Sequence, residues 1–464
     1  MDVFANESTL LEDLRPIVVT GRISKVVGMV AECQDFNVPV GAGCVVESAE
    51  GCMRCEAEVI GFNESRTLLM PYGETQGLSR GDRVRCVARS RTVRVGRGLL
   101  GRVLDGMGRP IDGKGPILAE QERPLSAVAP HPLQRQRVTE PLSTGIRVID
   151  ALTTIGKGQR MGIFSGSGVG KSTLIGMIAR YTNAAVNVIA LVGERGREVR
   201  EFLEEDLGPE GLKRSVVVVA TGDQPPLLRV RAGLLANAVA EFFRDQGLDV
   251  VLMMDSLTRL AWAQREIGLA GGEPPATKGY PPSVFAIMPR ILERAGLASR
   301  GSITGFYAVL VDADDINEPI GDTARGILDG HVWLSRRLAQ RGQYPSVDPL
   351  VSISRVMKDV VDEQHRGAAL YLKQLLAAFA EMEDLINIGA YVEGSNQEVD
   401  VARAMMPKIR EFLCQSVSVG SDVTQARGQL VELVHECRTL GQTQSQARNG
   451  ASPGGSRPDP KDRK

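Results

Sequence analysis

The stretch "SGSGVGKST", Ser165–Thr173, decides the fold of this chain of 464 residues. An apolar run, "RMGIFS" at 160–165, precedes it, and "STLIGMIARY" at 172–181 follows with apolar residues at helical spacing. A strand, a glycine-rich turn and a helix N-terminus together hold phosphate groups. The glycines let backbone N–H groups point at phosphate oxygens, and the helix dipole favours negative charge. We therefore predict a nucleotide phosphate loop (P-loop) within an α/β domain.

The residues of this loop divide the binding of ATP and Mg²⁺ between them. Glycines at 166, 168 and 170 supply the unusual backbone conformations, Lys171 reaches the β- and γ-phosphates, and the Ser172 hydroxyl binds Mg²⁺. Ser165 stands where the usual pattern begins with glycine, and a small residue fits at the exit of a strand. The predicted nucleotide-binding residues of the loop are Ser165, Gly166, Ser167, Gly168, Val169, Gly170, Lys171, Ser172 and Thr173.

Apolar runs alternate with helical patterns after residue 158. The runs are short, β-branched and almost free of charge, which is typical of strands buried on both faces of a parallel sheet. Between two of them, residues 227–247 repeat apolar positions at helical spacing. The runs are "VNVIALV" at 186–192, "SVVVVA" at 215–220, "DVVLMM" at 249–254 and "FYAVLV" at 306–311. This alternation predicts βαβ units in one parallel sheet.

Carboxylates follow three of these strand-like runs. Asp255 ends one run and is expected beside the Mg²⁺, while Glu194 follows another and is placed to polarise an attacking water. Asp312, Asp314 and Asp315 follow a third run. Carboxyl ends of parallel strands meet at one edge of an open sheet, where ligands bind. We therefore predict hydrolysis of the nucleotide; for Glu194 alone, a solvated glutamate at a helix start is the alternative.

The stretch "GQYPSVDPLVSISRVM" at 342–357 carries two more candidates. Tyr344 is a possible aromatic contact for adenine. Arg355 has two interpretations that the sequence leaves open: a structural ion-pair partner, or a group that stabilises the transferring phosphate in a neighbouring subunit's site.

The chain divides into five segments. Residues 19–95 hold short β-like runs between turn signals and predict a small barrel or sandwich. The α/β core is assigned to 96–365, and 366–440 has helical patterns throughout. Residues 441–464 are polar and rich in Gly, Pro and Ser, which predicts disorder. Residues 1–18 place apolar side chains at near-helical spacing, although a terminus of this kind is often frayed.

Composition excludes several classes of protein. The 55 basic and 56 acidic residues nearly balance, so no overall charge attracts nucleic acid or an anionic membrane. The N-terminus lacks the basic and apolar regions of a signal peptide, and no apolar run approaches the ~18 residues that span a bilayer. Seven scattered cysteines do not suggest a disulfide framework. We expect a cytoplasmic protein.

Six motifs, in this order, resemble those of a known family. They are "GSGVGKST", "GERGREVREF", "DSLTRLA", "GEPPATKGYPPSVFAIMPRILERAG", "GSITGFYAVLVDADDINEPIGD" and "QYPSVDPLVSISRVM". Over roughly residues 20–440 the chain resembles the ATPases of type III protein export, which serve flagella and injectisomes and are relatives of the catalytic subunit of rotary ATP synthases. The resemblance implies a RecA-like P-loop core with an N-terminal β-barrel and a C-terminal helical domain, assembled as a homohexameric ring.

The resemblance also implies roles for individual residues. Lys171 and Ser172 match the phosphate and Mg²⁺ ligands, and Asp255 the strand-end acid that shares the metal site with Ser172. Tyr344 matches the aromatic beside adenine. The implied catalytic residues are Lys171, Glu194, Asp255 and the arginine finger Arg355. Ser165 departs from the alanine that is usual in the family, but it is also small and the three later glycines are present, so the resemblance still implies nucleotide binding.

The family implies partners and a location. Its members work at the cytoplasmic face of an export apparatus, with export gate and stalk components, export substrates and chaperones, and at most peripheral membrane association. A regulatory, stator-like export protein is expected to bind residues 1–18. "GEPPATKGYPPSVF" and "LLGRVLDGMGRPIDG" favour the flagellar branch, so we expect the ATP-hydrolysing motor of flagellar export; the alternative is the injectisome ATPase.

Two rivals from other classes fit less well. A hexameric RNA translocase has a similar core, and the chain does contain a basic run at Arg80, Arg83, Arg85, Arg89, Arg91, Arg94 and Arg97. Single-strand binding relies on aromatic platforms, yet no Phe, Tyr or Trp lies between Tyr72 and Phe164, so we expect no nucleic-acid partner. Alternation in "RVRC" simply indicates a strand with one solvated face. A noncatalytic ring subunit is expected to lack the glutamate that is present at position 194.

Overall fold

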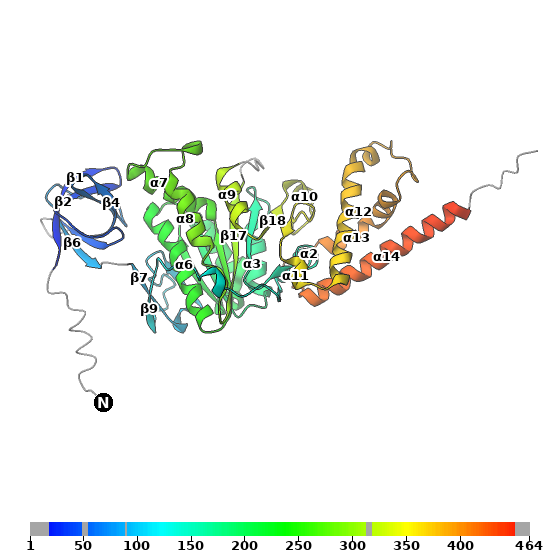
Figure 1. The fold of residues 1–464 in the computed structure, drawn as a ribbon, viewed down its shortest axis with the longest axis horizontal. Helices are drawn as coiled ribbons and strands as arrows, with labels where there is room; N and C mark the ends of the chain where they lie inside the picture. The colour runs from blue at the N-terminus through cyan, green and yellow to red at the C-terminus, as the bar shows by residue number, and fades with distance from the viewer. Residues whose placement is uncertain (1–17, 49–53, 89–90, 312–317, 451–464) are drawn as a thin grey trace, which may run out of the picture.

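Three parts follow one another along an elongated molecule. The computed structural model describes residues 18–48, 54–88, 91–311 and 318–450. Figure 1 shows a β-barrel at one end, an α/β core in the middle and a group of helices at the other end. This order matches the arrangement expected from the sequence.

An antiparallel barrel forms the N-terminal part. Its strands run in the order β1-β2-β5-β4-β3-β6 and close on themselves. Alternate side chains such as Ile23, Cys33 and Val84 point inward and are buried, as the period of two in a strand requires. The strands are β1 (Thr20–Val27), β2 (Val30–Gln34), β3 (Gly43–Glu47), β4 (Arg54–Asn63), β5 (Arg66–Pro71) and β6 (Arg83–Ala88). The expected N-terminal β-barrel is confirmed.

The connector between barrel and core is also structured. Strands β7 (Thr92–Val95) and β9 (Gln121–Pro124) pair as a small antiparallel sheet. Between them, β8 (Arg102–Asp105) joins the edge of the core sheet beside β14. Short helical turns flank these strands at η1 (Arg97–Leu99) and η2 (Pro132–Gln134). The glycine-rich connector is therefore built into the core.

The core is a mostly parallel sheet in the order β19-β18-β12-β17-β15-β13-β14-β8. The apolar runs identified in the sequence form its central strands and are buried on both faces. Its strands are β12 (Arg160–Ser165), β13 (Val186–Val192), β14 (Ser215–Ala220), β15 (Asp249–Asp255), β17 (Ser302–Leu310), β18 (Gly330–Leu334) and the antiparallel edge strand β19 (Ile353–Ser354). Short antiparallel pairs add β10 (Pro141–Leu142), β11 (Ile155–Gly156) and β16 (Gly296–Leu297).

Helices cover the sheet, and α6 is packed against β13, β14 and β15 (Figure 1). The helices of the core are α2 (Arg147–Leu152), α3 (Lys171–Tyr181), α4 (Gly196–Glu201), η3 (Phe202–Leu207), α5 (Gly208–Lys213), α6 (Pro226–Asp245), α7 (Leu257–Ala270), η4 (Thr277–Gly279), α8 (Pro282–Leu292), α9 (Pro319–Ile327), α10 (Arg336–Gln340) and α11 (Met357–Val360). The strand order brings the carboxyl ends of β12, β17, β15 and β13 together at one edge of the sheet.

Three helices form the C-terminal part: α12 (Glu363–Asn387), α13 (Gln397–Leu413) and α14 (Val423–Gly450). They pack against one another and against α2 of the core. We expected disorder over residues 441–464, but α14 continues to Gly450; residues 451–464 lie outside the described residues. The reason is that no proline interrupts the sequence before residue 453, and the Gln397 side chain of α13 donates hydrogen bonds to the Gly441 carbonyl and the Ser445 hydroxyl.

Candidate active site

The glycine-rich loop joins the end of β12 to the start of α3. Strand β12 lies between β17 and β18 and is parallel to both, so the loop leaves the carboxyl edge of the sheet. Gly168 and Gly170 have φ angles of 75° and 90°, which residues with a side chain rarely adopt. Gly170 caps α3, whose first residue is Lys171. The loop therefore has the strand, turn and helix N-terminus that a phosphate site needs.

Lys171 meets the two predicted carboxylates at this edge. Its Nζ lies 3.4 Å from Glu194 Oε1, which follows β13, and pairs with Asp255 Oδ1 at the end of β15. Glu194 and Asp255 are only 6% and 2% exposed. An unpaired buried charge is costly, so the lysine stabilises both carboxylates. The structure thus brings together three of the four predicted catalytic residues.

Burial and the charge of Lys171 act on the pKa values of both Glu194 and Asp255. Burial raises the pKa of Asp255, and the charge of Lys171 opposes that shift. Burial also raises the pKa of Glu194, as does a hydrogen bond shared with Glu198, while the charges of Lys171 and Arg259 lower it. A carboxyl whose pKa lies above its usual range is better matched to proton transfer near neutral pH than an exposed one.

Arg259 is the site residue that sequence reasoning missed. Its Nη1 lies 2.8 Å from Glu194 Oε2 and donates to the Gly193 carbonyl at 2.6 Å. A Cβ at Gly193 would lie 2.8 Å from the Arg259 side chain, so this glycine makes room for the arginine. The signal was present in "DSLTRLA", because Arg259 stands four residues after Asp255, near the start of α7.

The hydroxyls at the loop have distinct surroundings. Ser165 ends β12 and is buried; its Oγ has no hydrogen-bond partner within the described ranges. Ser172 is exposed at the start of α3. Thr173 donates a hydrogen bond that lowers the pKa of Asp206, although burial raises it more. The side chain of Ser165 is thus enclosed at the exit of β12.

Ser172 and Asp255 suit Mg²⁺ in its usual mode of binding. Mg²⁺ prefers oxygen ligands, keeps several waters and is held by one or two protein oxygens together with substrate phosphates. Across the residues that the structure describes, no group of three His, Cys, Asp or Glu side chains could hold a metal by itself. An exposed hydroxyl and a strand-end carboxylate beside a phosphate loop fit an ion that arrives with its nucleotide.

Tyr344 lies directly beside the phosphate loop. A Cβ at Gly170 would be 3.7 Å from two carbon atoms of its ring. The Ser346 hydroxyl donates to the Val169 carbonyl at 2.7 Å, which fixes this segment to the loop. Tyr344 is 47% exposed, so much of its side chain is accessible to a ligand. The predicted base-side aromatic and phosphate loop are thus neighbours.

Arg355 is not brought to Lys171 in the same chain. Its backbone N–H donates to the Asp329 carbonyl, and Asp329 pairs with Arg160 at the amino end of β12. The phosphate loop leaves the other end of that six-residue strand, which is about 16 Å long. The Arg355 guanidinium donates to the Arg325 carbonyl at 3.5 Å. Among the residues that the structure describes, no carboxylate lies within 4.0 Å of this guanidinium.

Several residues that the sequence analysis singled out lie outside the described ranges or away from the active site. Asp312, Asp314 and Asp315, and residues 1–17, lie outside the described residues. In the basic run, Arg91 pairs with buried Glu58, and Arg85 lies 3.6 Å from Glu47. These contacts partly neutralise the run. Within the described ranges, no helix is long and apolar enough to cross a bilayer.

Comparisons with known proteins agree with this architecture. The beta-barrel domain of the ATP synthase alpha/beta family matches residues 23–87, the nucleotide-binding domain of that family matches 145–354, and the C-terminal domain of the type III secretion ATPase EscN matches 361–432.

Two relatives and one solved structure span most of the chain. The chain is 54% identical over 398 residues to the flagellum-specific ATP synthase of Bacillus subtilis, covering 85% of this chain and 90% of the relative. It is 50% identical to the type 3 secretion system ATPase of Xanthomonas euvesicatoria, covering 88% and 93%. The structure of assembled EscN with its central stalk EscO, from enteropathogenic E. coli, matches with a TM-score of 0.83 and 43% identity over 89% of this chain and 100% of that one. The chain therefore belongs to the ATP synthase alpha/beta family, in the branch of type III secretion and flagellar ATPases, and is a nucleotide-binding ATPase.

Proposed function

We propose that this chain is the Mg²⁺-dependent ATP-hydrolysing motor of flagellar type III protein export. The observation that carries the proposal is the contact of Lys171 with two buried carboxylates under a phosphate loop. This is an arrangement that positions and polarises groups around a γ-phosphate. The 54% identity to a flagellum-specific relative supports the flagellar branch.

Each residue has a separate task in the proposed reaction. The backbone N–H groups of the loop bind the phosphates, and Lys171 leaves its carboxylate partners to neutralise the β- and γ-phosphates. Ser172 and Asp255 would hold Mg²⁺, which would offset the negative charge of the phosphates. Glu194 orients a water and accepts its proton as the water oxygen bonds to the γ-phosphorus, while the bond from that phosphorus to the β–γ bridging oxygen breaks and ADP leaves. The ring of Tyr344 stacks on the base.

Arg259 is proposed to set the protonation of Glu194. Its positive charge lowers the pKa of Glu194, against the effect of burial. Glu194 acts while ionised, so removing this charge raises its pKa and moves the acid limb of the pH–activity profile to higher pH. We expect this shift in Arg259→Ala and a smaller one in Arg259→Lys. Arg265→Ala, on the same helix, is the control and should leave the limb in place; an unmoved limb in Arg259→Ala would refute the assignment.

A closed ring is proposed as the working form. The active site of one chain lacks Arg355, and a relative of 43% identity has been solved as an assembled ATPase with a central stalk. A head-to-tail ring gives every chain one neighbour that supplies Arg355 and one that receives it. We propose a homohexamer that contacts a stalk component and the export gate, in the cytoplasm at the face of the export apparatus, where substrates and chaperones arrive.

The N-terminal segment is proposed to bind a regulatory, stator-like export protein. Phe4, Leu10, Leu11, Leu14 and Ile17 have near-helical spacing, which suits burial against a partner. Deletion of residues 2–18 should abolish co-purification with that partner and leave ATP binding intact. Co-purification at the level of the full chain would show that the partner binds elsewhere.

A chromosomal variant tests the choice of export system. Lys171→Ala should abolish swimming motility and export of filament protein in the native host, since the phosphate-binding charge is lost. If the host also carries an injectisome, its secretion should continue. Loss of injectisome secretion with normal motility would reverse the assignment.

A further inference from the structure

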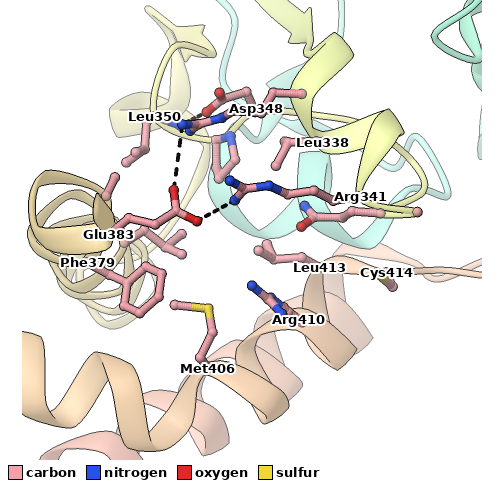
Figure 2. Close-up of a pocket in the computed structure, with 16 residues that line it drawn as sticks. Leu338, Arg341, Asp348, Leu350, Phe379, Glu383, Met406, Arg410, Leu413 and Cys414 are labelled. Carbon is pink, nitrogen blue, oxygen red and sulfur yellow. Dashed lines mark hydrogen bonds and ion pairs between the residues drawn. The ribbon is translucent and has the colours of Figure 1, made fainter. Parts of the chain in front are cut away.

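A cavity of about 430 Å³ lies between the core and the C-terminal helices. One wall is the core segment around α10 and residues 341–350, and the other is formed by α12 and α13 (Figure 2). None of the phosphate-loop residues lines it. Its volume lies in the range of small-molecule sites, ≈300–1,000 Å³.

Part of the lining of this cavity is apolar. Phe379 of α12 faces Met406 and Leu413 of α13, and Leu338 of the core lies opposite (Figure 2). Met406 and Leu413 are 9% and 4% exposed, so these side chains are packed in the wall of the cavity that α13 forms. Such a surface favours an aromatic or short alkyl group over water.

Three arginines, Arg337, Arg341 and Arg410, line the cavity. The Glu383 carboxylate pairs with Arg341 Nη1 at 2.5 Å and lies 3.7 Å from Arg337 Nη1. Arg410 also lines the cavity, and Figure 2 shows its guanidinium between Met406 and Leu413. No carboxylate lies within 4.0 Å of Arg410 in the part of the chain that the structure describes. The lining holds three arginines against the two carboxylates of Glu383 and Asp348, so one positive charge is in excess, and Arg410 is available to an anion.

We propose that this cavity binds a small organic anion with an aromatic or short alkyl body. Its carboxylate or sulfonate head pairs with Arg410, whose fork of donors suits such groups. Its body lies against Phe379, Met406 and Leu413. The ligand thereby bridges the ATPase core and the C-terminal helices.

The cavity is connected to the base side of the nucleotide site. Gln343 and Cys414 line the cavity. The residues that follow them in the chain, Tyr344 and Gln415, are hydrogen-bonded to each other: the Gln415 N–H donates to the Tyr344 carbonyl at 2.9 Å. The Gln415 side chain also donates to the Gly145 carbonyl of the core at 2.8 Å. An occupant that moves either wall displaces Tyr344. This part of the inference rests on the proposed nucleotide site, and coupling between two ligands is reciprocal.

Binding is tested with the fluorescent anion 8-anilinonaphthalene-1-sulfonate on the full chain without nucleotide. We expect one site per chain, weakened at least ~10-fold in Arg410→Ala, the scale for losing a hydrogen bond to a charged group. Arg403→Ala is the matched control, because Arg403 is an exposed arginine on the same helix outside the cavity. Equal affinity in all three proteins would overturn the proposal, since the probe would then report other apolar surface.

Location and coupling are measured separately. The bound probe should slow alkylation of Cys414 by iodoacetamide, which is measured by peptide mass spectrometry; unchanged alkylation would place the probe elsewhere and overturn the site.

Saturating ADP should then change the probe's affinity in the wild type. If the probe binds through Arg410 and ADP binds normally without mutual effect, the coupling fails while both sites stand. If ADP does not bind at all, it is the proposed nucleotide site that fails.

Discussion

Arg355→Ala is expected to lower the rate of ATP hydrolysis by about 10³- to 10⁵-fold, the scale measured for arginine fingers, while nucleotide affinity changes little. The guanidinium is permanently charged and donates several hydrogen bonds in a planar fork, so it stabilises charge that develops on the transferring phosphoryl group. In the single chain it has no described carboxylate partner, as expected for a side chain that acts across an interface.

Arg355→Lys separates this role from a structural one. Lysine keeps the charge but not the fork, so it should recover only a small part of the activity. Steady-state hydrolysis, nucleotide binding and thermal unfolding are measured on the wild type, Arg355→Ala and Arg355→Lys under ring-forming conditions. Near-normal hydrolysis in Arg355→Ala, or a loss of activity that follows a loss of folded protein, would contradict the proposed role.

Glu194→Gln is expected to bind ATP but to hydrolyse it at least ~100-fold more slowly. The amide preserves the shape of the side chain and cannot accept a proton from water, so positioning and electrostatics at the attacking water are lost. Hydrolysis is followed in a single-turnover assay, and binding by equilibrium titration with Mg²⁺ present.

Glu201→Gln is the matched control for that variant. Glu201 lies on α4 close in sequence to Glu194, but its carboxylate pairs with exposed Arg197 on the surface. Surface pairs of this kind contribute little, so activity should stay near that of the wild type. Turnover by Glu194→Gln at the rate of this control would remove Glu194 from the mechanism.

The sequence was most informative where chemistry and local structure coincide. The phosphate loop was predictable because glycine, lysine and serine at fixed spacing follow a buried strand. Glu194 and Asp255 were predictable because parallel strands end at one edge of the sheet. Arg259 was missed because an arginine on a helix carries no signal of its own until the strand order places it against Glu194.

The features that sequence reasoning could not find depend on distant contacts. The cavity at Arg410 joins core residues 337–350 to helices that begin later in the chain, and no short pattern predicts such a meeting. The extension of α14 to Gly450 has the same cause, since Gln397 supports it from another helix. Polar composition alone predicted disorder there. Tertiary contacts decided both cases.

The central claim is that hydrolysis occurs between chains, and mixing two inactive variants tests it most directly. Lys171→Ala and Arg355→Ala proteins should each be nearly inactive alone, because each lacks one half of every composite site. In rings formed from an equal mixture, about a quarter of the head-to-tail interfaces join an intact loop to an intact arginine. We predict that ATP hydrolysis partly returns in the mixture. If mixed rings form, as shown by differently labelled subunits in one particle, and no activity returns at any ratio, the claim is contradicted.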